Sequence, residues 1–214
     1  MVQPGSGKGT VAKKIANKYG LINIDTGAMY RCIALKALNE HIGLEEKEKI
    51  IQISNHIKIE LKENGTVLMD DKDVTKEIRS KEVSSIVSPI SSLKEVRLNM
   101  VDMQRKMAAG KKVIMEGRDI TTYVFPNADV KIYLDASVEE RARRRYKEMQ
   151  EKGIDITYEE VINNIKQRDE NDKHKEIGSL MIAEDATIID TTNYSIDEVV
   201  RIVSKLIENT FKCL

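Results

Sequence analysis

Residues 3–11, QPGSGKGTV, combine glycines and a lysine in the order of a phosphate-binding loop. Gly5 and Gly7 allow successive backbone N–H groups to turn toward phosphate oxygens, and Lys8 adds a positive charge where a helix begins. The plain alternative is a glycine-rich tail. The apolar residues that follow at helical spacing favour the loop, because a tail has no reason to run directly into an amphipathic helix.

The loop departs from the literal pattern G-x-x-x-x-G-K-[ST] at two positions. Val2 stands where the first glycine belongs, and Gly9 stands where the Mg²⁺-binding hydroxyl belongs, with Thr10 directly after it. The dinucleotide pattern G-x-G-x-x-G also fails, because Thr10 replaces its last glycine. The segment therefore indicates phosphate binding without defining the ligand.

A second polar cluster, IDTGAMYR, runs from Ile24 to Arg31. A strand end delivers Thr26 to the start of a helix, and Arg31 follows one turn later. A hydroxyl, helix N–H groups and a guanidinium at that place suit a second phosphate. Capping of the helix by Asp25 or Thr26 is the structural alternative.

A third cluster follows the apolar run that ends at Met115. Glu116, Arg118 and Asp119 come where a parallel strand would end, and ligands of α/β proteins collect at that edge of the sheet. A surface ion pair between Arg118 and Asp119 is the alternative. The functional interpretation depends on the three clusters acting together.

The elements that must position these clusters indicate an α/β fold. Short runs rich in β-branched residues each precede polar residues and a helical pattern, as expected of parallel strands. Helix starts are marked by Ser or Thr with Glu three residues later. The strand runs are LINI before Asp25, KKVIM before Glu116, VKIYL before Asp135 and ATIID ending at Asp190, and the capping pairs are Ser137 with Glu140, Thr157 with Glu160 and Ser195 with Glu198.

The pattern changes between about 57 and 75. Ile57, Ile59 and Leu61 alternate with polar residues, and Asn64-Gly65 is typical of a hairpin turn. This stretch predicts a small antiparallel insert in the α/β chain.

Composition limits the partners. The 214 residues suit one domain, and Lys+Arg and Asp+Glu both number 35, so no overall charge recruits nucleic acid or an anionic membrane. Cys32 and Cys213 have no metal-like spacing and suit a reducing compartment. No apolar run reaches the roughly 18 residues of a membrane span. We expect a cytoplasmic protein that binds small molecules, with no nucleic acid or membrane partner.

Five segments in order resemble one family. They are PGSGKGT, IDTGAMYR, EIRSKEVSSIVS, GRDITTYVFPNADVKIYLDASVEERARRRYKEMQEKG and IKQRDENDKH, and they closely resemble bacterial cytidylate kinases over nearly the whole chain. The resemblance implies transfer of the γ-phosphoryl group of ATP to CMP or dCMP, giving ADP and CDP or dCDP, in pyrimidine nucleotide metabolism. It also implies Mg²⁺ with ATP and a monomer.

The implied fold is a single P-loop kinase domain over 1–214, with a three-layer parallel sheet flanked by helices. Its core would take about 1–38, 85–145 and 176–214, the nucleoside-monophosphate-binding insert about 39–84, and the lid region about 146–175. In this fold a buried central strand precedes the phosphate loop, and only Met1 precedes Val2 here. The expectation is a missing N-terminal central strand, and therefore a shortened kinase that binds ATP poorly and folds marginally.

The resemblance implies roles residue by residue. Four residues are assigned to catalysis by this resemblance: Lys8, Arg118, Asp119 and Arg168. Lys8 would bridge the transferred group, and Arg118 would bind the CMP phosphate. Asp119 would accept a hydrogen bond from the cytosine amine, and Arg168 would lie near the ribose. The ATP-binding residues would be Gly5, Ser6, Gly7, Lys8, Gly9, Thr10, Arg144 and Arg145. The CMP-binding residues would be Thr26, Arg31, Ser88, Arg97, Arg118, Asp119, Arg168 and Asp172.

Three consecutive arginines in ERARRRYK, Arg143 to Arg145, are candidates for stabilising the transferred phosphoryl group. Helical spacing cannot place all three on one face, so we expect one or two to point at phosphate. Pairing with Glu139, Glu140 and Glu148 on a solvated helix face is the alternative. A nucleic-acid patch is disfavoured, because acidic residues interleave the arginines and no aromatic platform accompanies them.

Some positions depart from the family. Glu116 stands where aspartate is usual, and Lys175 stands where arginine is usual, and lysine cannot reproduce a guanidinium fork. Gly9 leaves no hydroxyl for metal, so no residue is assigned to a metal and Mg²⁺ would be held through water and the ATP phosphates. Another monophosphate kinase acting on UMP or AMP, an inactive family member and a P-loop switch remain alternatives.

Overall fold

The computed structural model describes residues 6–151, 153–173 and 178–212. The chain divides into two compact units. The first unit comprises Met1–Gly20, Arg118–Lys175 and Ser179–Leu214, and the second comprises Leu21–Gly117 with Glu176–Gly178. No helix in the described ranges is both long and apolar enough to cross a membrane.

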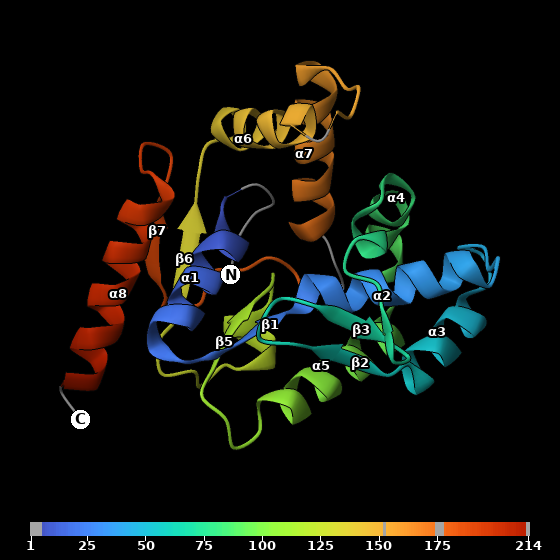
Figure 1. Ribbon diagram of the computed structural model, residues 1–214, viewed down its shortest axis with the longest axis horizontal. Coiled ribbons are helices and arrows are strands. Elements are labelled where there is room, and N and C mark those ends of the chain that lie inside the picture. Colours follow the sequence, from blue (N-terminus) through green and yellow to red (C-terminus); the bar gives the residue numbers. More distant parts are fainter. Residues whose placement is uncertain (1–5, 152, 174–177, 213–214) are drawn as a thin grey trace. The chain divides into compact units, whose positions relative to one another are not determined.

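The first unit is built on a parallel strand pair and helices (Figure 1). Its strands pair in register from Ile132 with Thr187 to Asp135 with Asp190, which confirms the predicted parallel arrangement. Its elements are α1 (Lys8–Tyr19), the π-helical turn η2 (Ile120–Val124), β6 (Ile132–Asp135), α6 (Val138–Glu151), α7 (Tyr158–Lys173), β7 (Thr187–Asp190) and α8 (Ile196–Lys212). The expected absence of a strand ahead of the phosphate loop concerns residues 1–5, which lie outside the described residues.

Helices α1 and α8 pack against each other. The buried face of α1 consists of Val11, Ala12, Ile15 and Ala16, and Gly20 ends the helix at a φ of 63°. Polar contacts border this apolar face: Lys14 Nζ lies 2.5 Å from a carboxylate oxygen of Asp197, and the Tyr19 hydroxyl donates to Glu208 at 2.7 Å. Segments far apart in the sequence are thereby joined.

Helices α6 and α7 pack together around a small apolar core of their own, and they cross each other in the view of Figure 1. Ala142, Val161 and Ile165 are buried there, and the rings of Tyr146 and Tyr158 meet edge to face at 5.8 Å. Burial of apolar surface holds the two helices together without fixing their direction.

Two of the three predicted capping boxes are complete. These are Thr157 with Glu160 and Ser195 with Glu198. In each, the glutamate carboxylate accepts a hydrogen bond from the backbone N–H of the Thr or Ser. The Thr or Ser hydroxyl accepts one in return from the backbone N–H of the glutamate. The box predicted at Ser137 is only half formed. Ser137 Oγ accepts from Glu140 N at 3.2 Å, but Ser137 N donates to Thr192, because arginines occupy the Glu140 carboxylate.

The second unit contains a parallel strand pair and an antiparallel sheet. Strands β1 and β5 are parallel, from Ile22 with Val113 to Asp25 with Glu116, as predicted. Its elements are β1 (Ile22–Asp25), α2 (Thr26–Asn39), α3 (Lys47–His56), β2 (Ile59–Leu61), β3 (Val67–Met69), β4 (Lys72–Asp73), the 3₁₀ turn η1 (Glu77–Arg79), α4 (Lys81–Ile90), α5 (Lys94–Ala108) and β5 (Val113–Glu116).

The predicted antiparallel insert is confirmed as the sheet β2-β3-β4. Gly65 has a φ of 87° in the first hairpin, at the predicted Asn64-Gly65 turn. The second hairpin has Asp70 and Asp71 at φ values of 49° and 66°, and Asp70 also accepts from Lys58 N. Aspartate is among the few residues that tolerate this left-handed conformation.

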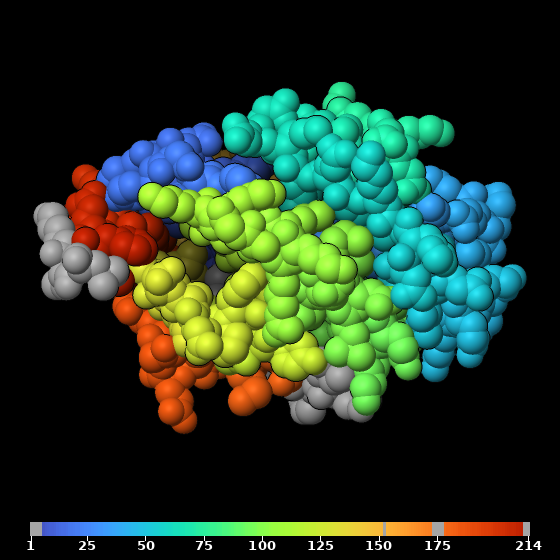
Figure 2. Space-filling model, turned by 90° about the horizontal axis from the view of Figure 1, so that it is seen from below, coloured from blue at the N-terminus to red at the C-terminus, as the bar shows by residue number. Residues whose placement is uncertain are grey.

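Helix α2 lies at the centre of the second unit, and Met29, Cys32, Ile33, Ala34 and Ala37 are almost wholly buried on it. Around it, α3 and α5 pack side by side and adjoin on one face in Figure 2. Asn99 of α5 fixes that contact by donating to Ser54 and Asn55 of α3.

The buried Cys32 thiol is predicted to be unreactive. Its pKa is raised to about 12, first by burial and then by the charges of Asp25 and Asp70. In a Cys213→Ser variant, iodoacetamide at pH 8 should leave the native protein unmodified and label it fully in urea, as mass spectrometry would show. Rapid labelling without urea would contradict the burial.

The same shift predicts a pH dependence of stability. The pKa of the thiol in the folded protein lies above its ordinary value of 9.0. Below pH 9 the thiol is protonated in both the folded and the unfolded chain, so it adds no pH dependence to the free energy of unfolding. Between pH 9 and about 12 the unfolded chain loses this proton first, and the fold is destabilised as pH rises. The free energy of unfolding should therefore decrease more steeply above pH 9 in the native chain than in a Cys32→Ala variant.

Candidate active site

The start of α1 is shaped as an anion site. Gly7 adopts a φ of 85° and a ψ of 4° immediately before Lys8 begins the helix, and the Gly7 carbonyl accepts from Val11 N at 3.1 Å. Ser6, just before, is buried. A helix N-terminus directs backbone N–H groups and the positive end of its dipole outward, so this turn can bind phosphate. Gly5, assigned to the same loop, lies outside the described residues.

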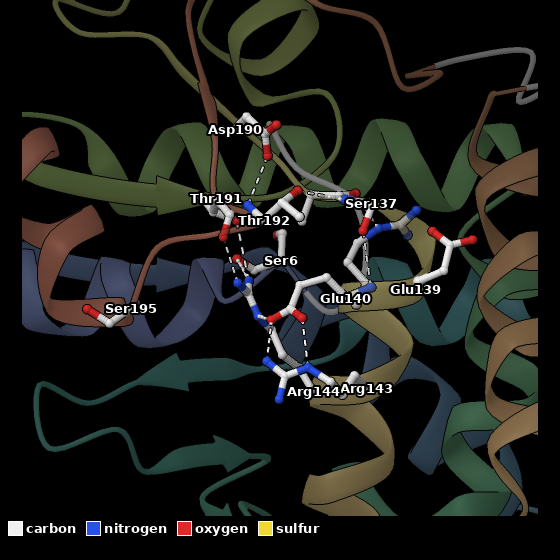
Figure 3. Close-up of polar contacts among 12 residues, drawn as sticks. Ser6, Ser137, Glu139, Glu140, Arg143, Arg144, Asp190, Thr191, Thr192 and Ser195 are labelled. Atoms are coloured by element: carbon white, nitrogen blue, oxygen red, sulfur yellow. Dashed lines mark hydrogen bonds and ion pairs between the residues drawn. The ribbon is translucent and has the colours of Figure 1, made fainter.

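Arg144 of α6 reaches this loop. It donates to the Ser6 carbonyl at 3.4 Å, to the Thr191 carbonyl at 2.7 Å and to Glu140 at 2.7 Å (Figure 3). Thr191 is itself fixed, because its N–H and hydroxyl both donate to the Asp135 carbonyl. The guanidinium is thus held beside the phosphate turn by groups from three elements.

The other two arginines of the run behave differently. Arg143 is mostly exposed and binds both carboxylate oxygens of Glu140, and Arg145 pairs with Glu148 at 2.8 Å. Hydrogen bonds from Arg143 first and then from Arg144 lower the pKa of Glu140 below its ordinary value. The pairing with glutamates weighed as an alternative is therefore present, and Arg144 is the arginine that also contacts the loop.

Arg118 and Asp172, both assigned to CMP, are brought together. Arg118 Nε donates to an Asp172 carboxylate oxygen at 2.8 Å, and both side chains are largely buried. Asp119 is also buried, and its carbonyl accepts from Tyr123 and Val124 in the turn η2. The ion pair of Arg118 is therefore with Asp172, 54 positions away in the sequence, and not the surface pair with Asp119 that was the alternative.

Sequence reasoning missed the most buried ion pair of this unit. Arg141 binds both carboxylate oxygens of Asp169, at 3.1 and 2.7 Å, and donates to the Ala136 carbonyl at 3.0 Å. The two side chains are 2% and 8% exposed. Arg141 lies two residues before the run Arg143 to Arg145, and Asp169 follows the half-buried Arg168. A charged residue at a helical position that faces the core, as Arg141 does on α6 and Asp169 on α7, is the sequence signal that could have indicated this pair.

In the second unit, Thr26 and Asp25 organise the start of α2. The Asp25 carboxylate caps the helix by accepting from Ala28 N at 3.0 Å, and the Thr26 hydroxyl donates to the Glu116 carbonyl at 2.8 Å. The capping alternative is therefore what Asp25 does. A phosphate contact at Thr26 would use the helix N-terminus or require its hydroxyl to turn.

Arg31 and Ser88 lie near the helix α4. Arg31 donates to the Ile78 carbonyl at 3.1 Å and to Ser84 Oγ at 2.9 Å, which ties α2 to the turn η1 and the helix α4 that follow the antiparallel sheet. Ser88 is half-buried on α4, and its carbonyl accepts from the hydroxyls of Ser91 and Ser92.

Arg97 is 2% exposed, and its guanidinium donates to the Ser91 and Gly178 carbonyls. It also lies 5.7 Å from the centre of the Tyr30 ring. These contacts restrict the orientation of the guanidinium group.

No group of three or more potential metal ligands occurs among residues 6–151, 153–173 and 178–212. The side chain that follows the loop, Thr10, is exposed. Lys175 lies outside the described residues, so the consequence of lysine at that position stays open to experiment.

Parallel strand pairs flanked by helices define a mixed α/β protein, and the left-handed glycine turn that opens a helix beside a fixed arginine has the form of a phosphate-binding turn. A solved structure supports the fold: an uncharacterized protein from Eubacterium ventriosum superposes with a TM-score of 0.52 at 12% identity, covering 97% of this chain and 95% of that one.

The chain belongs to the cytidylate kinase family, whose model matches residues 4–209. A cytidylate kinase of Caldicellulosiruptor saccharolyticus is 48% identical over 94% of this chain and 91% of its own. A cytidylate kinase of Fusobacterium nucleatum is 45% identical, covering 95% and 93%, and one of Clostridioides difficile is 46% identical, covering 94% of each.

The phosphate turn yields a prediction with an internal control. Gly7 and Gly20 both have positive φ, and an alanine costs about 1–2 kcal/mol in that conformation. A Cβ at Gly7 would also meet Ile196 Cδ1, a side-chain end that can rotate, whereas nothing lies within 4 Å of one at Gly20. Gly7→Ala and Gly20→Ala should therefore lose similar stability in urea unfolding.

Only Gly7→Ala should weaken ATP binding, by tenfold or more in a titration, since only Gly7 shapes the loop. Equal ATP affinity in the two variants would exclude this turn as the ATP site.

Proposed function

We propose that this chain is an ATP-dependent (d)CMP kinase, which transfers the γ-phosphoryl group of ATP to CMP or dCMP and releases ADP and CDP or dCDP. The family match over residues 4–209 is the observation that carries the proposal. The glycine turn at the start of α1 gives it a physical basis, because a phosphoryl transferase must first bind the phosphates of its donor.

On the donor side, the turn Gly5 to Thr10 binds the ATP phosphates and Lys8 bridges the transferred group. Arg144 donates to the Ser6 carbonyl at 3.4 Å, which places its guanidinium group next to this turn. Arg145 is the second arginine in this role. Its partner Glu148 lies three residues away on the same helix with a partly solvated side chain, so this ion pair is a weak competitor for it.

On the acceptor side, Thr26, Arg31 and Arg118 bind the CMP phosphate. Ser88, Arg97 and Asp119 recognise cytosine: a carboxylate accepts from the exocyclic amine, and donors meet the ring nitrogen and carbonyl. Arg168 and Asp172 bind the ribose and the lid side of the site. Asp172 holds Arg118 at 2.8 Å, so a guanidinium is in place before its phosphate arrives.

Catalysis rests on position and charge. The CMP phosphate oxygen attacks the γ-phosphorus of ATP, the bond from that phosphorus to the bridging oxygen breaks, and ADP leaves. Lys8, with Arg144 and Arg145 from the arginine run, neutralises charge on the transferred group, while Arg118 and Arg168 hold CMP in position, and the transfer needs little covalent chemistry from the protein. Mg²⁺ bound through the ATP phosphates and water supplies further charge neutralisation when present.

We further propose one P-loop kinase domain, with a core of about 1–38, 85–145 and 176–214, a nucleotide-binding insert of about 39–84 and a lid of about 146–175. The antiparallel sheet β2-β3-β4 lies within that insert, and helix α7 with the end of α6 lies within that lid. The proposal also includes a monomer in the cytoplasm with no nucleic acid or membrane partner; the balanced charge gives no field that would recruit nucleic acid or a membrane, and the free thiol of Cys32 suits a reducing compartment.

The alternatives weighed from the sequence are less favoured. The relatives reported above are cytidylate kinases, so a UMP or AMP kinase, an inactive member or a P-loop switch has no comparable support. A coupled assay of ADP release should show faster phosphorylation of CMP or dCMP than of UMP or AMP. Faster turnover of either alternative nucleotide would overturn the proposal.

Asp119 should carry the choice of base. Asp119→Ala should reduce kcat/KM for CMP more than for UMP, because loss of the acceptor leaves a cytosine donor unpaired at about 1–3 kcal/mol. The exposed Asp129, ten residues later, provides a control, and Asp129→Ala should change neither value. Equal losses for CMP and UMP, or an effect confined to ATP, would contradict the assignment.

Two segments of the chain, the insert and the lid, should close when both substrates bind. Two anionic nucleotides must meet with water excluded, so segments around 57–75 and 145–175 should close on them. Hydrogen exchange should slow in both segments when a bisubstrate analogue binds, while helix α8 serves as the reference. Unchanged exchange in both segments with the analogue tightly bound would rule out closure.

A further inference from the structure

Helix α7 carries two buried carboxylates, three positions apart, and each holds an arginine from another part of the first unit. Asp169 binds Arg141 of α6, and Asp172 binds Arg118. Arg168 lies directly before the first of these carboxylates. The placement of α7 therefore decides where the catalytic residue Arg168 and the Arg118–Asp172 pair are held.

The contact of Arg141 is directional at both ends. Its Nη1 and Nη2 meet the two Asp169 oxygens at 3.1 and 2.7 Å, and its Nε donates to the Ala136 carbonyl at 3.0 Å. Ala136 follows the last residue of β6, so one side chain links the end of a strand to α7. Two parallel hydrogen bonds between planar groups fix both separation and rotation.

The apolar core between α6 and α7 is less directional than this contact. Ala142, Val161 and Ile165 hold the helices together, but the hydrophobic effect that favours their burial depends on area and not on direction. A buried ion pair is also weak evidence for stability, because desolvation opposes its attraction, and a defined register is a better-attested use. The main effect of the Arg141–Asp169 pair is therefore on the register between α6 and α7, and not on the free energy of unfolding.

We propose that Arg141 and Asp169 are positioning residues, which fix the register of α7 on α6 so that Arg168 and the Arg118–Asp172 pair are held for phosphoryl transfer. Neither residue touches substrate. The inference rests on the proposed function, and it adds two residues to those assigned above.

Three variants separate position from stability. Arg141→Lys keeps the charge and loses the fork, Asp169→Asn keeps the shape and loses the charge, and Arg141→Met with Asp169→Leu replaces the pair by apolar groups. Each should lower kcat for CMP phosphorylation about tenfold or more, since displacement of catalytic groups by about 1 Å can cost a hundredfold. The KM for ATP should stay within twofold, because Arg144 and the loop are anchored separately through Thr191.

The double variant is decisive where it folds. Apolar replacement of a buried pair often preserves the melting temperature, so a purely structural pair predicts recovered stability and recovered kcat together. A positioning pair predicts a near-native melting temperature with kcat still depressed. Native kcat in the double variant would overturn the inference. If that variant does not fold, Arg141→Lys assayed well below its melting temperature decides in the same way.

Lys147→Ala provides the matched control on α6. Lys147 and Glu151 form an exposed pair 4.0 Å apart, and its loss should leave kcat unchanged. Wild-type turnover tests the proposed function separately. Should the wild type phosphorylate neither CMP nor dCMP, hydrogen exchange in nucleotide-free α7 still tests the register: it should be faster in Arg141→Lys than in Lys147→Ala, and equal exchange would contradict the inference.

Discussion

A guanidinium group taken out of water needs acceptors for its N–H groups, and the first unit is organised around this constraint. Arg118, Arg141 and Arg144 are each held by a carboxylate, and two of them also by backbone carbonyls. The carboxylates come from α6 and α7, so these two helices set the positions of all three guanidinium groups. Under the function proposed above, a nucleotide phosphate at Arg118 or Arg144 would compete with acceptors that already hold these side chains.

The elements of the fold were largely predictable from local signals. Short β-branched runs before Asp25, Glu116, Asp135 and Asp190 became parallel strands, and Asn64-Gly65 became a hairpin turn. These signals depend on side-chain period and turn chemistry within a few residues. The capping box at Ser137 was wrong in part, because the Glu140 carboxylate is shared with arginines that a local pattern does not weigh.

Candidate site residues could be proposed from type and spacing, but their partners could not. Arg118 and Asp172 are 54 positions apart, and Arg141 and Asp169 are 28 apart. Which carboxylate an arginine meets depends on how helices pack, and a single sequence carries no direct record of that. The same limit hid Thr191, a buried residue whose carbonyl holds Arg144 from 47 positions away.

The packing of α1 on α8 has a consequence for synthesis on the ribosome. Lys14 and Asp197 meet across 183 residues, and Gly7 lies against Ile196. Until α8 has emerged, the apolar face of α1 has no such cover, and contacts between distant residues form slowly because a long loop must close first. The nascent chain would therefore expose the apolar face of α1 for most of its translation, and we expect chaperones that bind apolar segments to bind the first unit during synthesis.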